Sequence, residues 1–217
     1  MNGNVATHLC NSLNISYGSA LSLQASNVID YGTNTSAIIK GKKNIKLRDF
    51  LIDMHRVPFG LIPEDKELNC GIKNLKEEGK QVYIFSNAIN QNYIPKVLNS
   101  LGVDLSLFDG ISGIEDVGYH SKPTRGAYDV FIMRNGIEPK RSIMIEDSIP
   151  NLKTAKEYGM KTMLIAYPKS KHKDVDLNKN FIDYISYDIN TGLNFIRGGS
   201  VNDLVRSRVR ETGQFVR

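Results

Sequence analysis

The chain is poor in features that mark several protein classes. Its 217 residues include only two cysteines, Cys10 and Cys70, which lie far apart and form no CxxC pair. This argues against a disulfide framework or a zinc site and favours a reducing compartment. No apolar run approaches the roughly 20 residues that cross a bilayer. The first residues also lack the basic and apolar regions of a signal peptide. We therefore expect a cytoplasmic protein with no membrane partner.

Two further classes are disfavoured by missing patterns. The sequence has no GxxxxGK[ST] motif, which excludes a P-loop nucleotide hydrolase. The formal net charge is +5 and the isoelectric point is near 9.1, but the basic residues fall into small groups that are not interleaved with aromatic residues. Such a surface favours small anionic substrates, and we expect no nucleic-acid partner.

The residues that are present indicate two structural units and a tail. Residues 1–61 carry apolar side chains at helical spacing and no strong strand pattern. From 62 to 197, helix and strand patterns alternate, which predicts an α/β fold with right-handed crossovers on a mostly parallel sheet. Residues 198–217 are predicted to be a basic tail, either a short amphipathic helix or frayed. We expect strands near 81–85, 110–113, 142–146, 162–166 and 183–187.

Three short segments carry groups that suit phosphate chemistry. Ser86-Asn87 follows one predicted strand, Glu146-Asp147 ends another, and Lys122 precedes a proline at the start of a predicted helix. Ligands of open parallel sheets bind at the carboxyl ends of the strands. A hydroxyl can donate to a phosphoryl oxygen, an ammonium neutralises its charge, and adjacent carboxylates suit Mg²⁺.

Each segment also has an ordinary structural interpretation. Ser86-Asn87 could be a turn or a helix cap, and a single lysine such as Lys122 is normally solvated. Asp147 or Ser148 could cap the helix that follows. The order of the three segments, and not any one of them, favours the chemical interpretation.

In that order the segments resemble motifs II, III and IV of the haloacid dehalogenase (HAD) superfamily. The matching residues are Phe85-Ser86-Asn87, Ser121-Lys122-Pro123 and Ile145-Glu146-Asp147-Ser148. Residues 107–111, 114–119 and 151–160 look like the pyrimidine 5'-nucleotidase branch. The resemblance covers residues 4–197. It implies a Rossmann-like core at 62–197 and an incomplete, small helical cap at 1–61.

The resemblance also implies an activity and a set of roles. The activity is hydrolysis of a small phosphate monoester, a pyrimidine nucleoside 5'-monophosphate, through an aspartyl-phosphate. Ser86 and Asn87 would bind the phosphate, and Lys122 would be a catalytic residue that holds both the phosphate and the nucleophile. Asp147, with Glu146, would bind Mg²⁺.

One part of the family pattern does not occur. Motif I, an apolar strand that ends in Asp-x-Asp-x-Thr, should precede the cap. The nearest imitation contains Asp30, with Gly32 in place of the second aspartate. In the family this strand lies between the strands of motifs II and IV, so its loss would leave two unpaired edges or let those strands pair and close the site. We therefore expect little or no phosphatase activity. The first explanation is that the sequence is an incomplete copy of a longer enzyme. The second is that the protein is non-catalytic and binds phosphate or a nucleotide.

Overall fold

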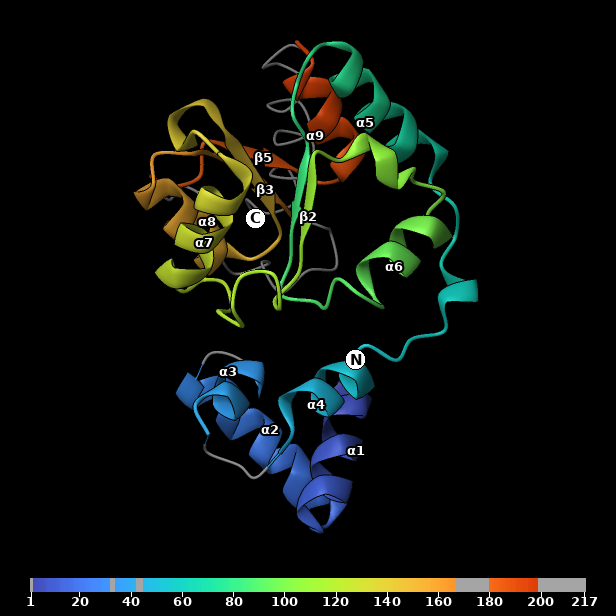
Figure 1. Ribbon diagram of the computed structural model, residues 1–217, viewed down its shortest axis with the longest axis vertical. Helices are drawn as coiled ribbons and strands as arrows, with labels where there is room; N and C mark the ends of the chain where they lie inside the picture. Colours follow the sequence, from blue (N-terminus) through green and yellow to red (C-terminus); the bar gives the residue numbers. More distant parts are fainter. Residues whose placement is uncertain (1, 32–33, 42–44, 167–179, 199–217) are drawn as a thin grey trace, which may run out of the picture.

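The first part of the molecule is a group of four helices. The computed structural model describes residues 2–31, 34–41, 45–166 and 180–198. Figure 1 shows the helices below the rest of the fold. We call them the helical unit: α1 (Asn2–Leu13), α2 (Tyr17–Tyr31), α3 (Asn34–Ile39) and α4 (Leu47–Met54). Gly32, named above in the imitation of motif I, and the predicted tail at 199–217 lie outside the described residues.

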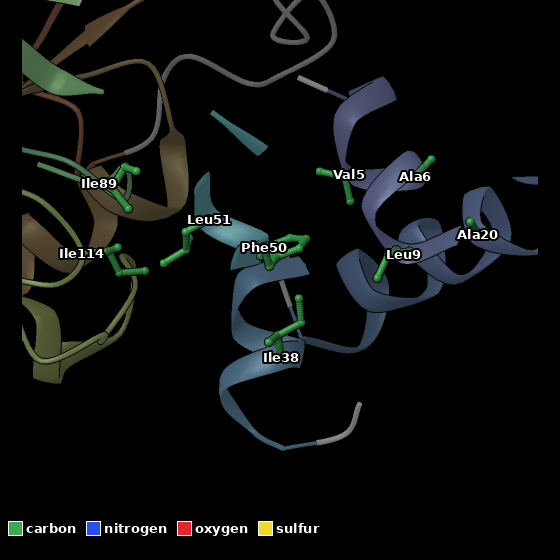
Figure 2. Close-up of a cluster of buried hydrophobic side chains, with 9 residues drawn as sticks. All are labelled: Val5, Ala6, Leu9, Ala20, Ile38, Phe50, Leu51, Ile89 and Ile114. Atoms are coloured by element: carbon green, nitrogen blue, oxygen red, sulfur yellow. The ribbon is translucent and has the colours of Figure 1, made fainter. Parts of the chain in front are cut away.

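The helical unit packs against the rest of the chain through one apolar cluster. Leu51 of α4 lies in this cluster together with Ile89 and Ile114, which belong to loops of the α/β part (Figure 2). The cluster consists of Val5, Ala6, Leu9, Ala20, Ile38, Phe50, Leu51, Ile89 and Ile114. A polar contact adds to it, since the hydroxyls of Ser36 and Ser121 are 2.8 Å apart. The two parts are therefore in direct contact.

The second part alternates helices and strands as the sequence predicts. Its strands are β1 (Tyr83–Phe85), β2 (Gly110–Ser112), β3 (Ile143–Glu146), β4 (Lys161–Ile165) and β5 (Tyr184–Ser186). Its α-helices are α5 (Lys66–Glu77), α6 (Ile94–Ser100), α7 (Arg125–Asn135), α8 (Ile149–Glu157) and α9 (Ile189–Ile196). Short 3-10 turns cover Phe59–Leu61, Leu105–Leu107 and Pro139–Arg141. Across the described ranges, no helix is long and apolar enough to cross a membrane.

Helix ends follow the local sequence. The Asp65 side chain accepts a hydrogen bond from the Leu68 amide and so begins α5. Pro95 lies in the first turn of α6, where a proline costs no hydrogen bond. Gly136 has φ 61° and ends α7 in the left-handed conformation. The five predicted strands match the observed strands to within two residues at each end.

All described strand pairs are parallel, as predicted, but they form two sheets. β1 pairs with β2, with Ile84 opposite Ile111. β3 pairs with β4, and β4 with β5, in a three-stranded sheet. No pairing joins β1 to β3 in the described residues. Of the two outcomes expected for a missing central strand, the structure therefore shows unpaired edges and not direct pairing.

The two sheets nevertheless share one layer between the same helices. Ile84 of β1 and Ile145 of β3 both pack against the cluster formed with α5, α6 and α9. Phe85 of β1 and Met144 of β3 both pack against the cluster formed with α7 and α8. Side chains of a strand alternate between the two faces of a sheet. β1 and β3 therefore present matching faces to the same helical layers.

Candidate functional site

Lys122 lies between the carboxyl ends of β1 and β3. Its ammonium donates a hydrogen bond to the carbonyl oxygen of Phe85 at 2.6 Å. The same nitrogen is 3.6 Å from a carboxylate oxygen of Glu146, which is an ion pair but too long for a hydrogen bond. Only 4% of the side chain is exposed. The Lys122-Pro123 peptide is cis, and α7 begins two residues after the proline.

The environment of this ammonium is both apolar and negatively charged. Burial lowers the pKa of Lys122, whereas the charges of Glu146 and Asp147 act in the opposite direction. The Phe85 ring adds a cation–π contact, with its centroid 4.8 Å from the nitrogen. A buried cation is costly unless it is paired. The site therefore holds a charged group at a place where solvation is poor.

Ser86 and Asn87 stand on the first residues after β1, but they differ in what they contact. The Ser86 hydroxyl accepts a hydrogen bond from the Ala88 amide at 3.1 Å. Both atoms of the Asn87 amide bind the backbone of Lys122: its nitrogen donates to the Lys122 carbonyl and its oxygen accepts from the Lys122 amide. Asn87 thereby positions Lys122. A serine hydroxyl that accepts one hydrogen bond can still donate another through its own proton.

Glu146 and Asp147 end β3 in different surroundings. The Glu146 side chain is 16% exposed and is held by Lys122 and by the Asn151 amide. Asp147 is exposed. Within the described ranges, no three side chains of histidine, cysteine, aspartate or glutamate converge on one point. The Glu146 and Asp147 carboxylates still suit Mg²⁺, because this ion typically takes only one or two protein carboxylates together with water and phosphate oxygens.

The loop after β1 is held by residues that the sequence-based assignment did not include. The Asn90 amide donates to the Ile111 carbonyl and to the carboxylate of Asp116. Glu115 accepts from the backbone amide of Asn90 at 2.6 Å. A Cβ at Gly113 would lie only 2.5 Å from that same backbone nitrogen. Glu115 and Asp116 lie in the segment 114–119 that carried the family resemblance, which was the available signal.

Asp30, the weak candidate for a nucleophile, lies away from these groups. It is exposed near the end of α2, and it accepts a hydrogen bond from the Ser26 hydroxyl one turn earlier. In the part of the chain that the structure describes, the carboxylate that pairs with Lys122 is that of Glu146.

Two hollows lie along the contact between the helical unit and the α/β part. The larger, about 390 Å³, lies beside His55 and Tyr93, and none of the three motif segments lines it. The smaller, about 120 Å³, is lined by Arg48 of the helical unit and by Glu115 and Tyr119. Tyr119 is close in sequence to Lys122 and has φ 60°. None of the three motif segments lines the smaller hollow either.

Comparison with protein families identifies the chain. A model of the haloacid dehalogenase-like hydrolase family matches residues 30–165, which is more than half of the sequence. The chain belongs to this family. The family assignment made from the three motif segments is thus confirmed, and so is the α/β fold that it implied. None of the curated proteins matches the sequence.

Solved structures of HAD proteins share the fold. A HAD phosphatase from Thermococcus onnurineus is 21% identical, with a TM-score of 0.57 over 92% of this chain and 89% of the other. An L-2-haloacid dehalogenase from Xanthobacter autotrophicus, with chloropropionic acid covalently bound, is 11% identical, with a TM-score of 0.52 over 91% and 84%. Both phosphatases and dehalogenases are therefore among the structural neighbours.

Proposed function

We propose that this HAD protein binds a small phosphate monoester, a pyrimidine nucleoside 5'-monophosphate, at the carboxyl ends of β1 and β3. The observation that carries the proposal is the buried Lys122 ammonium between Phe85 and Glu146. A phosphate is the anion that best satisfies a fixed ammonium together with a hydroxyl and a metal-binding carboxylate. The presence of a HAD phosphatase among the structural neighbours supports the choice.

Each group then has a separate task. Lys122 neutralises charge on the phosphate and holds it in place. The Ser86 hydroxyl donates to a phosphoryl oxygen, and Asn87 acts by fixing the Lys122 backbone. Asp147, with Glu146, would hold Mg²⁺. When bound, this ion supplies positive charge to the phosphate oxygens.

The nucleoside would extend toward the helical unit. We propose that it enters the hollow lined by Arg48 and Tyr119. We propose that the helical unit acts as the cap that contacts this part of the substrate. Ser36, which touches Ser121 beside Lys122, holds the cap against the phosphate site.

Turnover by the 217-residue chain should be very low. In the family an aspartate attacks the phosphorus, whereas the carboxylate that forms an ion pair with the Lys122 ammonium in this structure is that of Glu146. Without that nucleophile, bound ester has no covalent route to hydrolysis. The alternative function is a non-catalytic protein that binds a phosphate or a nucleotide. It predicts the same binding without turnover.

Calorimetric titration with cytidine and uridine 5'-monophosphate tests the proposal. We expect binding in the presence of Mg²⁺, and loss of about tenfold or more in affinity in Lys122→Met, because a charge-assisted hydrogen bond contributes about 1.5–3 kcal/mol. Lys161→Met is the matched control, since Lys161 is exposed at the start of β4.

Two results would contradict the proposal. One is binding that is the same in Lys122→Met and in the unchanged chain. The other is an equal affinity for adenosine and guanosine 5'-monophosphate, which would mean that the site does not prefer pyrimidines. Rapid Mg²⁺-dependent release of phosphate by the 217-residue chain would overturn the expectation of low turnover and indicate a different nucleophile.

A further inference from the structure

The larger of the two hollows, about 390 Å³, is lined by none of the residues assigned to the phosphate. Its volume falls at the lower end of the roughly 300–1,000 Å³ that is common for small-molecule sites. Its walls come from both parts of the molecule: Ile52 and His55 from α4 and its C-terminal end, and Tyr93 and Lys96 from the start of α6. Small-molecule sites are frequent at such contacts between structural units. The hollow is therefore large enough for a ligand and lies where ligands commonly bind.

One side of this hollow, which we call the aromatic wall, consists of His55, Phe59 and Tyr93. The centroids of the His55 and Tyr93 rings are 4.5 Å apart, and His55 is only 6% exposed. The Phe59 ring centroid lies 5.9 Å from that of Tyr93. Aromatic rings attract one another in offset or edge-to-face contact at centroid distances of about 4.5–7 Å. The aromatic wall thus favours a planar aromatic group.

The imidazole of His55 adds no positive charge to this wall near neutral pH. Its Nδ1 lies 2.7 Å from the Leu51 carbonyl oxygen, which can only accept, so Nδ1 carries a proton. Burial lowers the pKa of His55 and outweighs the opposite effects of that hydrogen bond and of the Glu115 carboxylate. Because the ring is neutral and Glu115 is negative, an anionic group is disfavoured beside it.

The rim of the hollow is positively charged. Arg56 and Lys96 both line it and are exposed, and no acidic residue lines it among those that the structure describes. Arg56 pairs with Asp53 through Nε at 3.0 Å, and a guanidinium has further N–H donors at its terminal nitrogens. The Lys96 nitrogen lies 5.7 Å from the Phe59 ring centroid, next to the aromatic wall. A carboxylate at this rim can therefore accept charge-assisted hydrogen bonds.

We propose that this hollow binds a small planar aromatic carboxylate, with its ring on the aromatic wall and its carboxylate at the rim. An aliphatic acid lacks the ring contacts, and a neutral aromatic molecule lacks the contacts with the two cations. The bound molecule would touch both the helical unit and the α/β part. The proposal does not depend on the phosphate site, because the two sites share no residue and take different ligands.

Calorimetric titration of the 217-residue chain with 2-naphthoate tests the proposal. Two matched compounds each lack one feature: 2-naphthalenemethanol has the rings but no charge, and cyclohexanecarboxylate has the charge but no aromatic ring. We expect saturable binding of 2-naphthoate with a dissociation constant below about 1 mM, and binding at least about fivefold weaker for both matched compounds.

Two variants separate the contributions of the rim and the wall. Arg56→Met with Lys96→Met should weaken the binding of 2-naphthoate about fivefold to tenfold and change that of 2-naphthalenemethanol less than about twofold. Tyr93→Leu should weaken both aromatic compounds about threefold to tenfold, because one ring contact is lost. Lys73→Met is the matched control for loss of a surface charge, since the Lys73 side chain on α5 is 62% exposed.

Nuclear magnetic resonance locates the ligand in the unchanged chain, so this test does not depend on how well the variants fold. The ring protons of His55 and Tyr93 should shift when 2-naphthoate is added. The proposal is wrong if the amides of Ser86 and Lys122 shift instead, or if inorganic phosphate displaces 2-naphthoate, since either result places the compound in the phosphate site. It is also wrong if 2-naphthalenemethanol binds as tightly as 2-naphthoate, or if no saturable binding occurs at millimolar concentration.

Discussion

The two sheets are built on the same plan and differ in how completely they are covered. In each, a lysine from a preceding helix binds an aspartate just before a strand: Lys76 with Asp109 before β2, and Lys156 with Asp183 before β5. The three-stranded sheet has an interior strand, β4, that is almost wholly buried. The two-stranded sheet has none. β1 and β3 both have helices on their two faces and are still only partly buried, so strand burial here depends on neighbours within the sheet.

Truncation of one apolar side chain in each sheet should show the largest contrast. Leu164 of β4 is 0% exposed, and Leu164→Ala should lower the free energy of unfolding by about 2–5 kcal/mol, because it leaves a cavity. Ile84→Ala should cost about 1–2 kcal/mol, because Ile84 is only partly buried. Urea unfolding followed by circular dichroism measures both. Equal effects would mean that β1 is as well covered as β4 in solution.

The two aspartates that form ion pairs with lysines, Asp183 and Asp109, should differ in how much their contribution to stability changes with pH. Burial raises the pKa of Asp183, but hydrogen bonds from Lys156 and Thr162 outweigh it and hold the pKa below its ordinary value of 3.8. The carboxylate therefore stabilises the fold above about pH 4, and this stabilisation is lost as the pH falls through the lowered pKa. Asp183→Asn should cost about 1.5–3 kcal/mol at pH 6. The deficit should shrink toward pH 3.

Asp109→Asn is the matched variant in the two-stranded sheet. The pKa of Asp109 is also lowered, by Lys76 and the Val82 amide acting against burial. Its side chain is 29% exposed, compared with 18% for Asp183, so solvent screens it more. We expect the same pH dependence with a smaller amplitude. An Asp109→Asn deficit larger than that of Asp183→Asn would contradict the view that the two-stranded sheet is the less enclosed one.

Gly113 tests whether the loop after β1 is tightly packed despite the open edge of that strand. A Cβ there would lie 2.5 Å from the Asn90 amide nitrogen and 2.7 Å from the Ala88 carbonyl oxygen. Gly113→Ala should cost about 1–3 kcal/mol and weaken nucleotide binding, since the loop carries Ser86. Gly60→Ala is the control, because no atom lies within 4 Å of its added Cβ. Unfolding and titration of both variants would decide this, and a neutral Gly113→Ala would show that the loop is loose.

The smallest expected effect belongs to the contact between the helical unit and the segment that carries Lys122. Ser36→Ala removes the 2.8 Å hydrogen bond to Ser121 and should cost about 0.5–1.5 kcal/mol. Ser22→Ala, on an exposed face of α2, should be neutral by comparison. Thermal unfolding measures both. If Ser36→Ala changes neither stability nor nucleotide affinity, this contact does not hold the helical unit in place.

Much of this molecule follows from local sequence. The alternating patterns predicted the five strands of the α/β part and helices between them, because apolar periodicity and helix-end signals such as Gly136 act within a few residues. The order of Ser86, Lys122 and Glu146-Asp147 was enough to indicate the family, which the family model confirms. Asn87 shows the limit of such reasoning, since a side chain predicted to bind phosphate instead contacts the Lys122 backbone with both amide atoms.

What only the tertiary structure decided concerns groups far apart in the chain. The sequence left two outcomes for β1 and β3, pairing or an open edge. The open edge could be seen only once both strands were placed between the same helices. The sequence likewise placed Lys122 near a strand end but could not say that its ammonium binds Phe85 and Glu146 together. Local patterns set the direction and length of each strand, whereas its neighbours depend on how distant segments pack.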